Sequence, residues 1–219
     1  MIVWLVSYPR SGNTYCRMLF KNFYGLDTYS IYDDPNFEKM GASSEIGHKN
    51  LPTGVDELRE RDELYVIKNH KVPTTGDRVI FLVRDGRAAQ VSRSHTRVHG
   101  KDPANKRFLK DLESLIRGKE WASMVHQFLE VPLSPCRKII TYEDLVKRPI
   151  ENLVELENFL KVSVKDDGKL PDFKSLHKRW PGFFRVGKTD SWKDEMPTRL
   201  QDLFWELQGD AMSLLGYLK

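Results

Sequence analysis

The sequence predicts an α/β protein in three layers, with a central, mainly parallel β-sheet flanked by helices. Short apolar runs alternate along the chain with longer segments in which apolar residues recur at helical spacing. The runs are almost continuously apolar and rich in β-branched and aromatic residues, which is typical of strands buried on both faces of a sheet. Strands and helices that alternate in this way form parallel sheets covered by helices on both faces.

Four apolar runs are the expected strands. Residues 2–6 are too few for a helix, and residues 79–83 are the most continuous run, so we expect them near the centre of the sheet. Residues 64–67 and 138–141 are the other two, and each leads directly into polar residues. Ligands of open α/β sheets bind beyond the carboxyl ends of the strands, so these polar residues are candidates for function.

Helical spacing predicts the segments that separate and follow these strands. The first helix follows the loop after residues 2–6, because Cys16, Leu19, Phe20 and Phe23 recur at helical spacing. Further helices are expected at residues 55–61, from residue 86, over residues 102–130, from residue 149 to 160 and over residues 198–215.

Length and charge limit the classes of protein to which the chain can belong. Its 219 residues suit one domain, residues 1–219, without an interdomain linker. A formal net charge of +4 suits an anionic ligand but is too small to indicate nucleic acid as a partner. Basic residues outnumber acidic ones between residues 93 and 119, which indicates either attraction of an acidic substrate or, as we favour, a solvated helix surface.

Cysteine usage and the first residues favour a cytoplasmic protein. Cys16 and Cys136 give no disulfide framework, which fits a reducing compartment. The N-terminal residues lack a basic region ahead of an apolar one, and no window has the length of a membrane span. The histidines lack ligand spacing with cysteines or carboxylates, so no metal site is expected.

The loop from Ser7 to Tyr15 has the composition of a phosphate-binding loop. Gly12 permits close approach of the backbone, Ser11, Asn13 and Thr14 add side-chain donors, and Arg10 adds a positive charge. The Walker pattern Gly-x-x-x-x-Gly-Lys-Ser/Thr of nucleotide kinases is absent. The alternative is an ordinary strand-to-helix turn whose serine and threonine cap the helix.

This loop resembles the 5′-phosphosulfate loop of the sulfotransferases that use 3′-phosphoadenosine 5′-phosphosulfate (PAPS), written Tyr-Pro-Lys-Ser-Gly-Thr-Thr-Trp in cytosolic members. The resemblance recurs in order at residues 68–70, 84–92, 142 and 185–192, and so covers most of the chain. It implies a P-loop-like fold, PAPS as sulfuryl donor, its desulfated product 3′-phosphoadenosine 5′-phosphate (PAP), and no metal.

Lys68 and His70 are the candidate catalytic pair. Imidazole titrates near neutral pH, and residues two apart on an extended strand end project to the same side. The resemblance implies the same pair, since Lys-x-His after this strand supplies the family's catalytic lysine and histidine. His70 would be the general base and Lys68 the cation able to protonate the leaving oxygen, whereas Arg10 supplies only electrostatic stabilisation. The alternative for His70 is a surface histidine beside Lys71.

The resemblance also implies which residues bind the nucleotide. Arg84 and Ser92 match the pair that binds the 3′-phosphate; the alternative is a salt bridge from Arg84 to Asp85 or Glu143. Arg185 and Gly187 match a segment that closes over this phosphate, with Val186 in place of the family's lysine and Ser191 in place of an aspartate. The implied adenine contacts are Tyr15, in place of a tryptophan, and Tyr142, with Phe173 a weaker candidate; a core role is the alternative for each aromatic.

Residues 27–54 show no sustained period and are dominated by turn residues, so we expect a long irregular segment there. Its two interpretations are a wall of the acceptor pocket and a disordered surface loop. Residues 181–197 likewise show no clear periodicity.

The sequence is therefore interpreted as a PAPS-dependent sulfotransferase that acts on a hydroxyl or amine. The acceptor, whether a small molecule, a saccharide or a lipid, stays open, as does the oligomeric state. Two alternatives also stay open: a P-loop-type nucleotide or small-molecule kinase, and a catalytically inactive nucleotide-binding protein of the same fold. The kinase would need a Walker lysine and a metal site.

Overall fold

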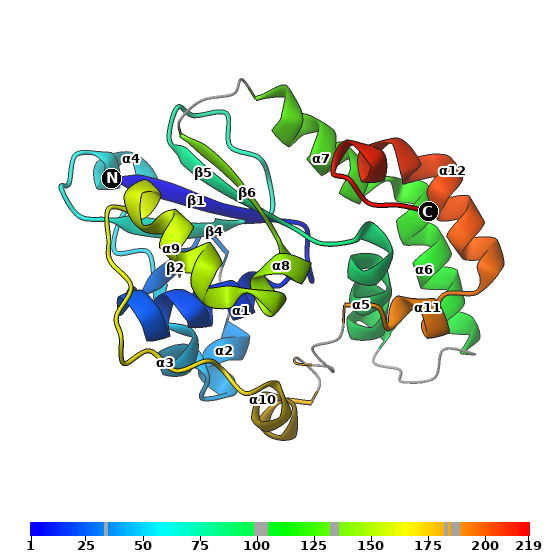
Figure 1. The fold of residues 1–219 in the computed structure, drawn as a ribbon, viewed down its shortest axis with the longest axis horizontal. Helices are drawn as coiled ribbons and strands as arrows, with labels where there is room; N and C mark the ends of the chain where they lie inside the picture. Colours follow the sequence, from blue (N-terminus) through cyan, green and yellow to red (C-terminus); the bar gives the residue numbers. More distant parts are fainter. Residues whose placement is uncertain (33–34, 99–104, 132–135, 182–183, 185–188) are drawn as a thin grey trace. The chain divides into compact units, whose positions relative to one another are not determined.

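The computed structural model describes residues 1–32, 35–98, 105–131, 136–181, 184 and 189–219. The chain forms two compact units, whose elements can be followed by colour in Figure 1. The sheet unit contains residues 1–7, 12–83 and 133–172, and the helical unit contains residues 8–11, 84–132 and 173–219. The expectation of a single domain over residues 1–219 stays a prediction.

The sheet unit is built on six strands in the order β3-β2-β4-β1-β5-β6, and every pair of neighbouring strands is parallel. The predicted fold class, a central parallel sheet with flanking helices, is confirmed. The run at residues 79–83 lies inside the sheet as expected, because β5 pairs with both β1 and β6. The strands are β1 (Ile2–Ser7), β2 (Thr28–Ser30), β3 (His48–Asn50), β4 (Tyr65–Asn69), β5 (Arg78–Val83) and β6 (Arg137–Thr141).

The prediction of an irregular segment at residues 27–54 is wrong for the part that the structure describes. This part contains β2, β3 and the helices α2 (Pro35–Lys39) and α3 (Ser43–Ile46). Strand β2 pairs with β4 on one side and with β3 on the other. Elements of three to five residues are too short to show a period, and the two strands among them are stabilised by pairing within the sheet.

The other helices of the sheet unit follow from the apolar spacing and from their caps. The Thr141 side chain accepts a hydrogen bond from the Asp144 backbone N–H at 3.1 Å, so β6 passes directly into α8. Pro149 opens α9, as predicted, and the predicted stripe of Leu153, Leu156 and Leu160 is buried. These helices are α1 (Asn13–Leu19), the π-helix η1 (Phe20–Tyr24), α4 (Val55–Arg59), α8 (Tyr142–Lys147) and α9 (Pro149–Leu160).

The helical unit packs around large aromatic side chains. Trp121, Phe108 and Phe204 are buried, and a Cβ atom on Gly86 would lie 2.7 Å from both Phe204 and Trp121. The predicted helix over residues 102–130 is in fact two helices, since Lys119 adopts a left-handed φ of 53° between them. The helices are α5 (Gly86–Val98), α6 (Lys106–Gly118), α7 (Glu120–Glu130), α10 (Phe173–Arg179), α11 (Trp192–Glu195) and α12 (Thr198–Leu214).

The two cysteines differ in accessibility, and neither forms a disulfide. Cys16 lies on α1 with no exposed surface, and burial raises the pKa of its thiol to about 12. Cys136, just before β6, is partly exposed. Because alkylation requires an accessible thiolate, we expect iodoacetamide at pH 8 to modify native wild type once, at Cys136, and a Cys136→Ser variant not at all. Mass spectrometry checks this; rapid modification of Cys16 in the native variant would contradict the buried position.

Candidate functional site

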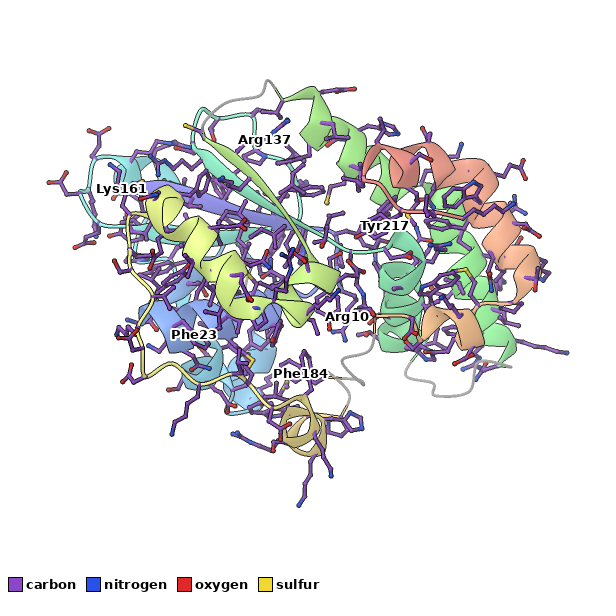
Figure 2. All side chains as sticks on the ribbon, viewed as in Figure 1. Arg10, Phe23, Arg137, Lys161, Phe184 and Tyr217 are labelled. Atoms are coloured by element: carbon purple, nitrogen blue, oxygen red, sulfur yellow. The ribbon has the colours of Figure 1, made fainter. Side chains whose placement is uncertain are left out.

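The loop between β1 and α1 has an unusual backbone. Arg10, labelled in Figure 2, adopts a φ of 71°, and Gly12 adopts a φ of 92°. A left-handed arginine is strained, and such strain is typical of functional sites. Residues of this conformation turn backbone N–H groups toward an anion in the concavities called nests. Two left-handed residues therefore shape this loop, and its binding of phosphate stays a prediction.

Gly12 is required at its position for a second reason. A Cβ atom built on Gly12 would lie 2.8 Å from Cε2 of Tyr142 and nearer still to Cδ2. Tyr142 begins α8, so the ring of one predicted site residue lies against the backbone of another. Any larger residue would displace either the loop or this ring.

Tyr15 and Tyr142 are both buried, with 5% of each residue exposed. Burial, and to a lesser degree the neighbouring Tyr142, raises the pKa of Tyr15 to about 12. The alternative interpretation, in which each ring is part of the hydrophobic core, predicts the same burial. Phe173 is partly exposed at the start of α10. The assignment of all three aromatics to adenine stays a prediction.

Other polar residues of the loop have different surroundings. Asn13 donates from Nδ2 to Ser7 Oγ at 3.1 Å and to the Leu5 carbonyl at 3.4 Å, so its amide ties α1 to β1. Ser11 is fully buried, and its hydroxyl has no hydrogen-bond partner among the described residues. A buried hydroxyl without such a partner is suited to donate a hydrogen bond to a bound anion. Thr14 follows on α1 and is partly exposed.

Lys68 and His70 stand at the carboxyl end of β4, where the sequence places them. Lys68 is in register with Leu5 of β1 and with Ser30 of β2. His70 Nδ1 lies 2.7 Å from the Ser7 carbonyl oxygen. Because a carbonyl only accepts, Nδ1 carries the proton, and in the neutral ring Nε2 holds the lone pair. The last residue of β1 thus orients the histidine in the tautomer whose Nε2 can act as a base.

Sequence reasoning missed one residue beside this pair. The Tyr32 ring centroid lies 5.3 Å from that of His70 and 5.7 Å from Lys68 Nζ, so one ring contacts both side chains. Phe37 lies 5.9 Å from the same ammonium. Both aromatic residues come from residues 27–54. Their occurrence among turn residues is the only feature of the sequence that could have indicated them as site residues.

Within the helical unit, three of the predicted phosphate-binding residues come together. Arg10 Nε donates to Ser92 Oγ at 3.2 Å, and Arg84 Nη1 donates to the Arg10 carbonyl at 3.2 Å. Trp121 Nε1 in turn donates to the Arg84 carbonyl at 3.2 Å. Arg84 and Ser92 are both buried. The structure therefore brings Arg10, Arg84 and Ser92, far apart in sequence, into one hydrogen-bonded cluster.

The third segment that the sequence predicts to bind phosphate lies outside the described residues. It comprises Arg185, Val186 and Gly187, together with Lys188. Beyond it, Trp192 is buried, with the Arg87 guanidinium 3.9 Å from its ring centroid. Arg87 also forms a salt bridge with Asp85, in which Nη2 lies 2.8 Å from Oδ2. The buried Trp192 ring thus packs against the Arg87 side chain.

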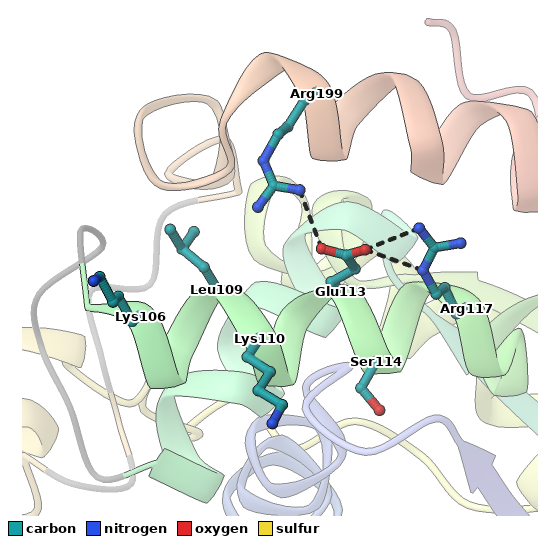
Figure 3. A pocket seen from close by; sticks show the side chains of 7 residues that line it. All are labelled: Lys106, Leu109, Lys110, Glu113, Ser114, Arg117 and Arg199. Carbon is teal, nitrogen blue, oxygen red and sulfur yellow. Dashed lines mark hydrogen bonds and ion pairs between the residues drawn. The ribbon is translucent and has the colours of Figure 1, made fainter.

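The basic segment around α6 has its own surface hollow of about 580 Å³, shown in Figure 3. None of the predicted site residues lines it. Glu113 accepts from Arg117 at 2.9 Å and from Arg199 at 3.1 Å, so part of the basic charge is compensated at the surface. This agrees with the preferred interpretation of a solvated helix face. The lining residues are Lys106, Leu109, Lys110, Glu113, Ser114, Arg117 and Arg199.

The described residues lack two further features. No group of three or more histidine, cysteine or carboxylate side chains there is arranged to hold a metal ion. None of the helices there combines the length and the hydropathy that crossing a membrane requires.

Comparison with known proteins gives one family and several similar structures. The family model described as the sulfotransferase domain matches residues 2–216. No curated protein matches the chain.

Among solved structures, mouse sulfotransferase SULT7A1 complexed with PAP is 18% identical, with a TM-score of 0.69 over 96% of this chain and 83% of that one. Retinol dehydratase, in complex with androsterone and inactive cofactor PAP, is 18% identical, with a TM-score of 0.66 over 96% of this chain and 80% of that one. The sulfotransferase domain from the curacin biosynthetic pathway is 17% identical, with a TM-score of 0.55 over 99% and 98%. At these identities the likeness shows the fold.

Proposed function

The chain belongs to the sulfotransferase domain family, and on that premise we propose that it transfers a sulfuryl group from PAPS to a hydroxyl or amine. The observation that carries this proposal is the cluster of Arg10, Arg84 and Ser92. The Arg10 guanidinium donates to the Ser92 hydroxyl and the Arg84 guanidinium donates to the Arg10 carbonyl, and two neighbouring guanidinium groups suit a phosphate-rich ligand. The PAP bound to similar structures supports the same ligand class.

The residues of the loop fit the donor. Ser11 offers a buried hydroxyl without a partner among the described residues, and Gly12 leaves no side chain between the loop and Tyr142. We assign Arg10, Ser11, Gly12, Asn13 and Thr14 to the 5′-phosphosulfate. When bound, the donor supplies the sulfuryl group that the acceptor receives.

The remaining donor contacts are assigned from the resemblance. Arg84 and Ser92 are assigned to the 3′-phosphate, together with Arg185, Val186 and Gly187, which lie outside the described residues. Tyr15 and Tyr142 are assigned to the adenine.

The catalytic roles follow from the charges and hydrogen bonds of the chain's own residues. His70 Nε2 accepts the proton of the acceptor, because Nδ1 is held by the Ser7 carbonyl. The resulting imidazolium keeps that hydrogen bond, so Ser7 stabilises both charge states. Arg10 and Lys68 offset negative charge on the leaving phosphate, and only Lys68 is also able to donate a proton.

Binding of PAP tests the proposal. We expect calorimetry without Mg²⁺ to show PAP binding, with ATP much weaker, and an Arg84→Ala variant to bind PAP about 10–100-fold more weakly. Loss of a hydrogen bond to a charged group costs about 1.5–3 kcal/mol, which corresponds to that range. Arg117→Ala removes the same charge from the exposed surface of α6 and is the matched control.

Two results would overturn the proposal. Failure of wild type to bind PAP would remove the donor, and ATP binding that requires Mg²⁺ would favour a kinase. If PAP binding were weakened equally in the Arg84 and Arg117 variants, the net positive charge of the protein would be what attracts PAP. That result would contradict the assigned role of Arg84.

The acceptor class in our proposal is a small molecule, saccharide or lipid with a hydroxyl or amine. Retinol dehydratase is similar in fold and was crystallised with androsterone and with retinol. These two alcohols, a simple phenol and an amine therefore form the first set of acceptors, with formation of PAP as the measurement.

A further inference from the structure

Tyr32 lies at the centre of the contacts that hold Lys68 and His70. We propose that Tyr32 is a positioning residue that holds these two side chains in their catalytic orientation. The inference rests on the proposed function, because it takes His70 as the base and Lys68 as the cation. Every contact that supports it lies within the sheet unit.

The Tyr32 hydroxyl fixes the chain where β4 ends. It accepts a hydrogen bond from the His70 backbone N–H at 3.0 Å and donates to Asn69 Oδ1 at 3.0 Å. The same Oδ1 accepts from the Lys71 backbone N–H at 2.9 Å. The phenol oxygen therefore ties Asn69, the last residue of β4, to His70, and Asn69 in turn binds Lys71. His70 is held both at its backbone and, through Ser7, at its ring.

The Tyr32 ring acts on the two side chains. It lies beside the His70 imidazole with an interplanar angle of 30°, and Lys68 Nζ is 5.7 Å from its centroid. An ammonium at this distance from an aromatic face is attracted by the quadrupole of the ring. The ring thus limits the positions open to the lysine and also covers one side of the histidine.

The sheet determines where Tyr32 stands. Ser30, the last residue of β2, is in register with Lys68, and its hydroxyl accepts from the Tyr32 backbone N–H at 3.1 Å. The Ile31 backbone N–H lies 3.5 Å from the Lys68 carbonyl oxygen. Tyr32 therefore lies two residues after β2, beside the residue that it is proposed to position, and its hydrogen bonds to Ser30 and Asn69 fix it there.

Removal of the hydroxyl alone tests the inference. In Tyr32→Phe the ring remains, but the His70 N–H and Asn69 Oδ1 each lose a partner. We expect turnover to fall about tenfold, since one hydrogen bond is worth up to about tenfold, while the Kd of PAP stays within about twofold. Tyr29→Phe is the matched control, because Tyr29 lies on β2 and its ring packs on Tyr65.

A double-mutant cycle distinguishes positioning from a general loss of stability. If Tyr32 acts through His70, Tyr32→Phe has no further effect on turnover in a His70→Gln background. An equal tenfold loss in both backgrounds would overturn the inference. No loss from His70→Gln itself would overturn the proposed base instead, so the two failures are distinguishable.

Nitrogen-15 NMR of the histidine rings gives a reading that needs no acceptor. In wild type we expect the neutral His70 ring to carry its proton on Nδ1, and in Tyr32→Phe we expect a measurable shift toward the Nε2-protonated tautomer. A tautomer population that is the same in wild type, Tyr32→Phe and Tyr29→Phe would show that Tyr32 does not position the ring.

Discussion

Replacement of His70 by glutamine is expected to lower turnover by about 10²–10⁴-fold, while the affinity for PAP stays within about twofold. General-base catalysis contributes an acceleration of this size, and a glutamine amide can still donate to the Ser7 carbonyl but cannot take up a proton. The measurement is PAP formation at saturating PAPS, in parallel with calorimetric titration by PAP.

His126→Gln is the matched control for this experiment. His126 lies on α7 and is partly exposed, where it contacts Asp210 at 3.0 Å. We expect this variant to retain wild-type turnover. A comparable loss in both variants, or a His70 variant with normal turnover, would show that the reaction does not use His70 as its base.

Replacement of Gly12 by alanine is expected to lower both stability and donor binding. The new methyl group would collide with the Tyr142 ring, and a φ of 92° is strained for any residue with a Cβ atom. Strain of this kind costs about 1–3 kcal/mol. Urea unfolding should show this loss, and PAP should bind more than about tenfold more weakly because the loop has shifted.

Gly76→Ala is the control for this substitution, since a Cβ atom there would meet nothing within 4 Å. The combination of Gly12→Ala with Tyr142→Ala separates the two causes of the loss. Tyr142→Ala removes the collision but not the backbone strain, so Gly12→Ala is expected to cost less stability in the Tyr142→Ala background than in wild type. A Gly12→Ala protein as stable as Gly76→Ala would contradict the described loop.

The sequence predicted the elements that have a long apolar pattern or whose stability depends mostly on residues close in sequence. The four strands predicted from apolar runs exist. Continuous β-branched and aromatic residues indicate strands buried on both faces, as in β1, whereas β6 lies at the edge of the sheet with Ile139 42% exposed. The break at Lys119 was missed because apolar residues recur at helical spacing on both sides of it, whereas Lys119 itself adopts a left-handed conformation.

Strands β2 and β3 could not be predicted for a different reason. Each has three residues, which is too few for a periodic pattern. β2 depends on pairing with β4, and β3 depends in turn on pairing with β2. The pairing of β2 with β4 brings Ser30 beside Lys68 across a long stretch of chain. Nothing in the local composition of residues 27–54 indicates this register.

For the candidate site, the sequence by itself determined the chemistry of the groups: the glycine-containing loop, Arg84 and Ser92 with the spacing of a strand end and a helix, and Lys68 and His70 two residues apart. The tertiary structure alone decided how these groups are held. The His70 tautomer depends on the Ser7 carbonyl of a neighbouring strand, and Tyr32 reaches Lys68 and His70 only because β2 pairs with β4. Residue types and spacing follow from covalent order, but hydrogen bonds between distant residues exist only once the sheet has formed.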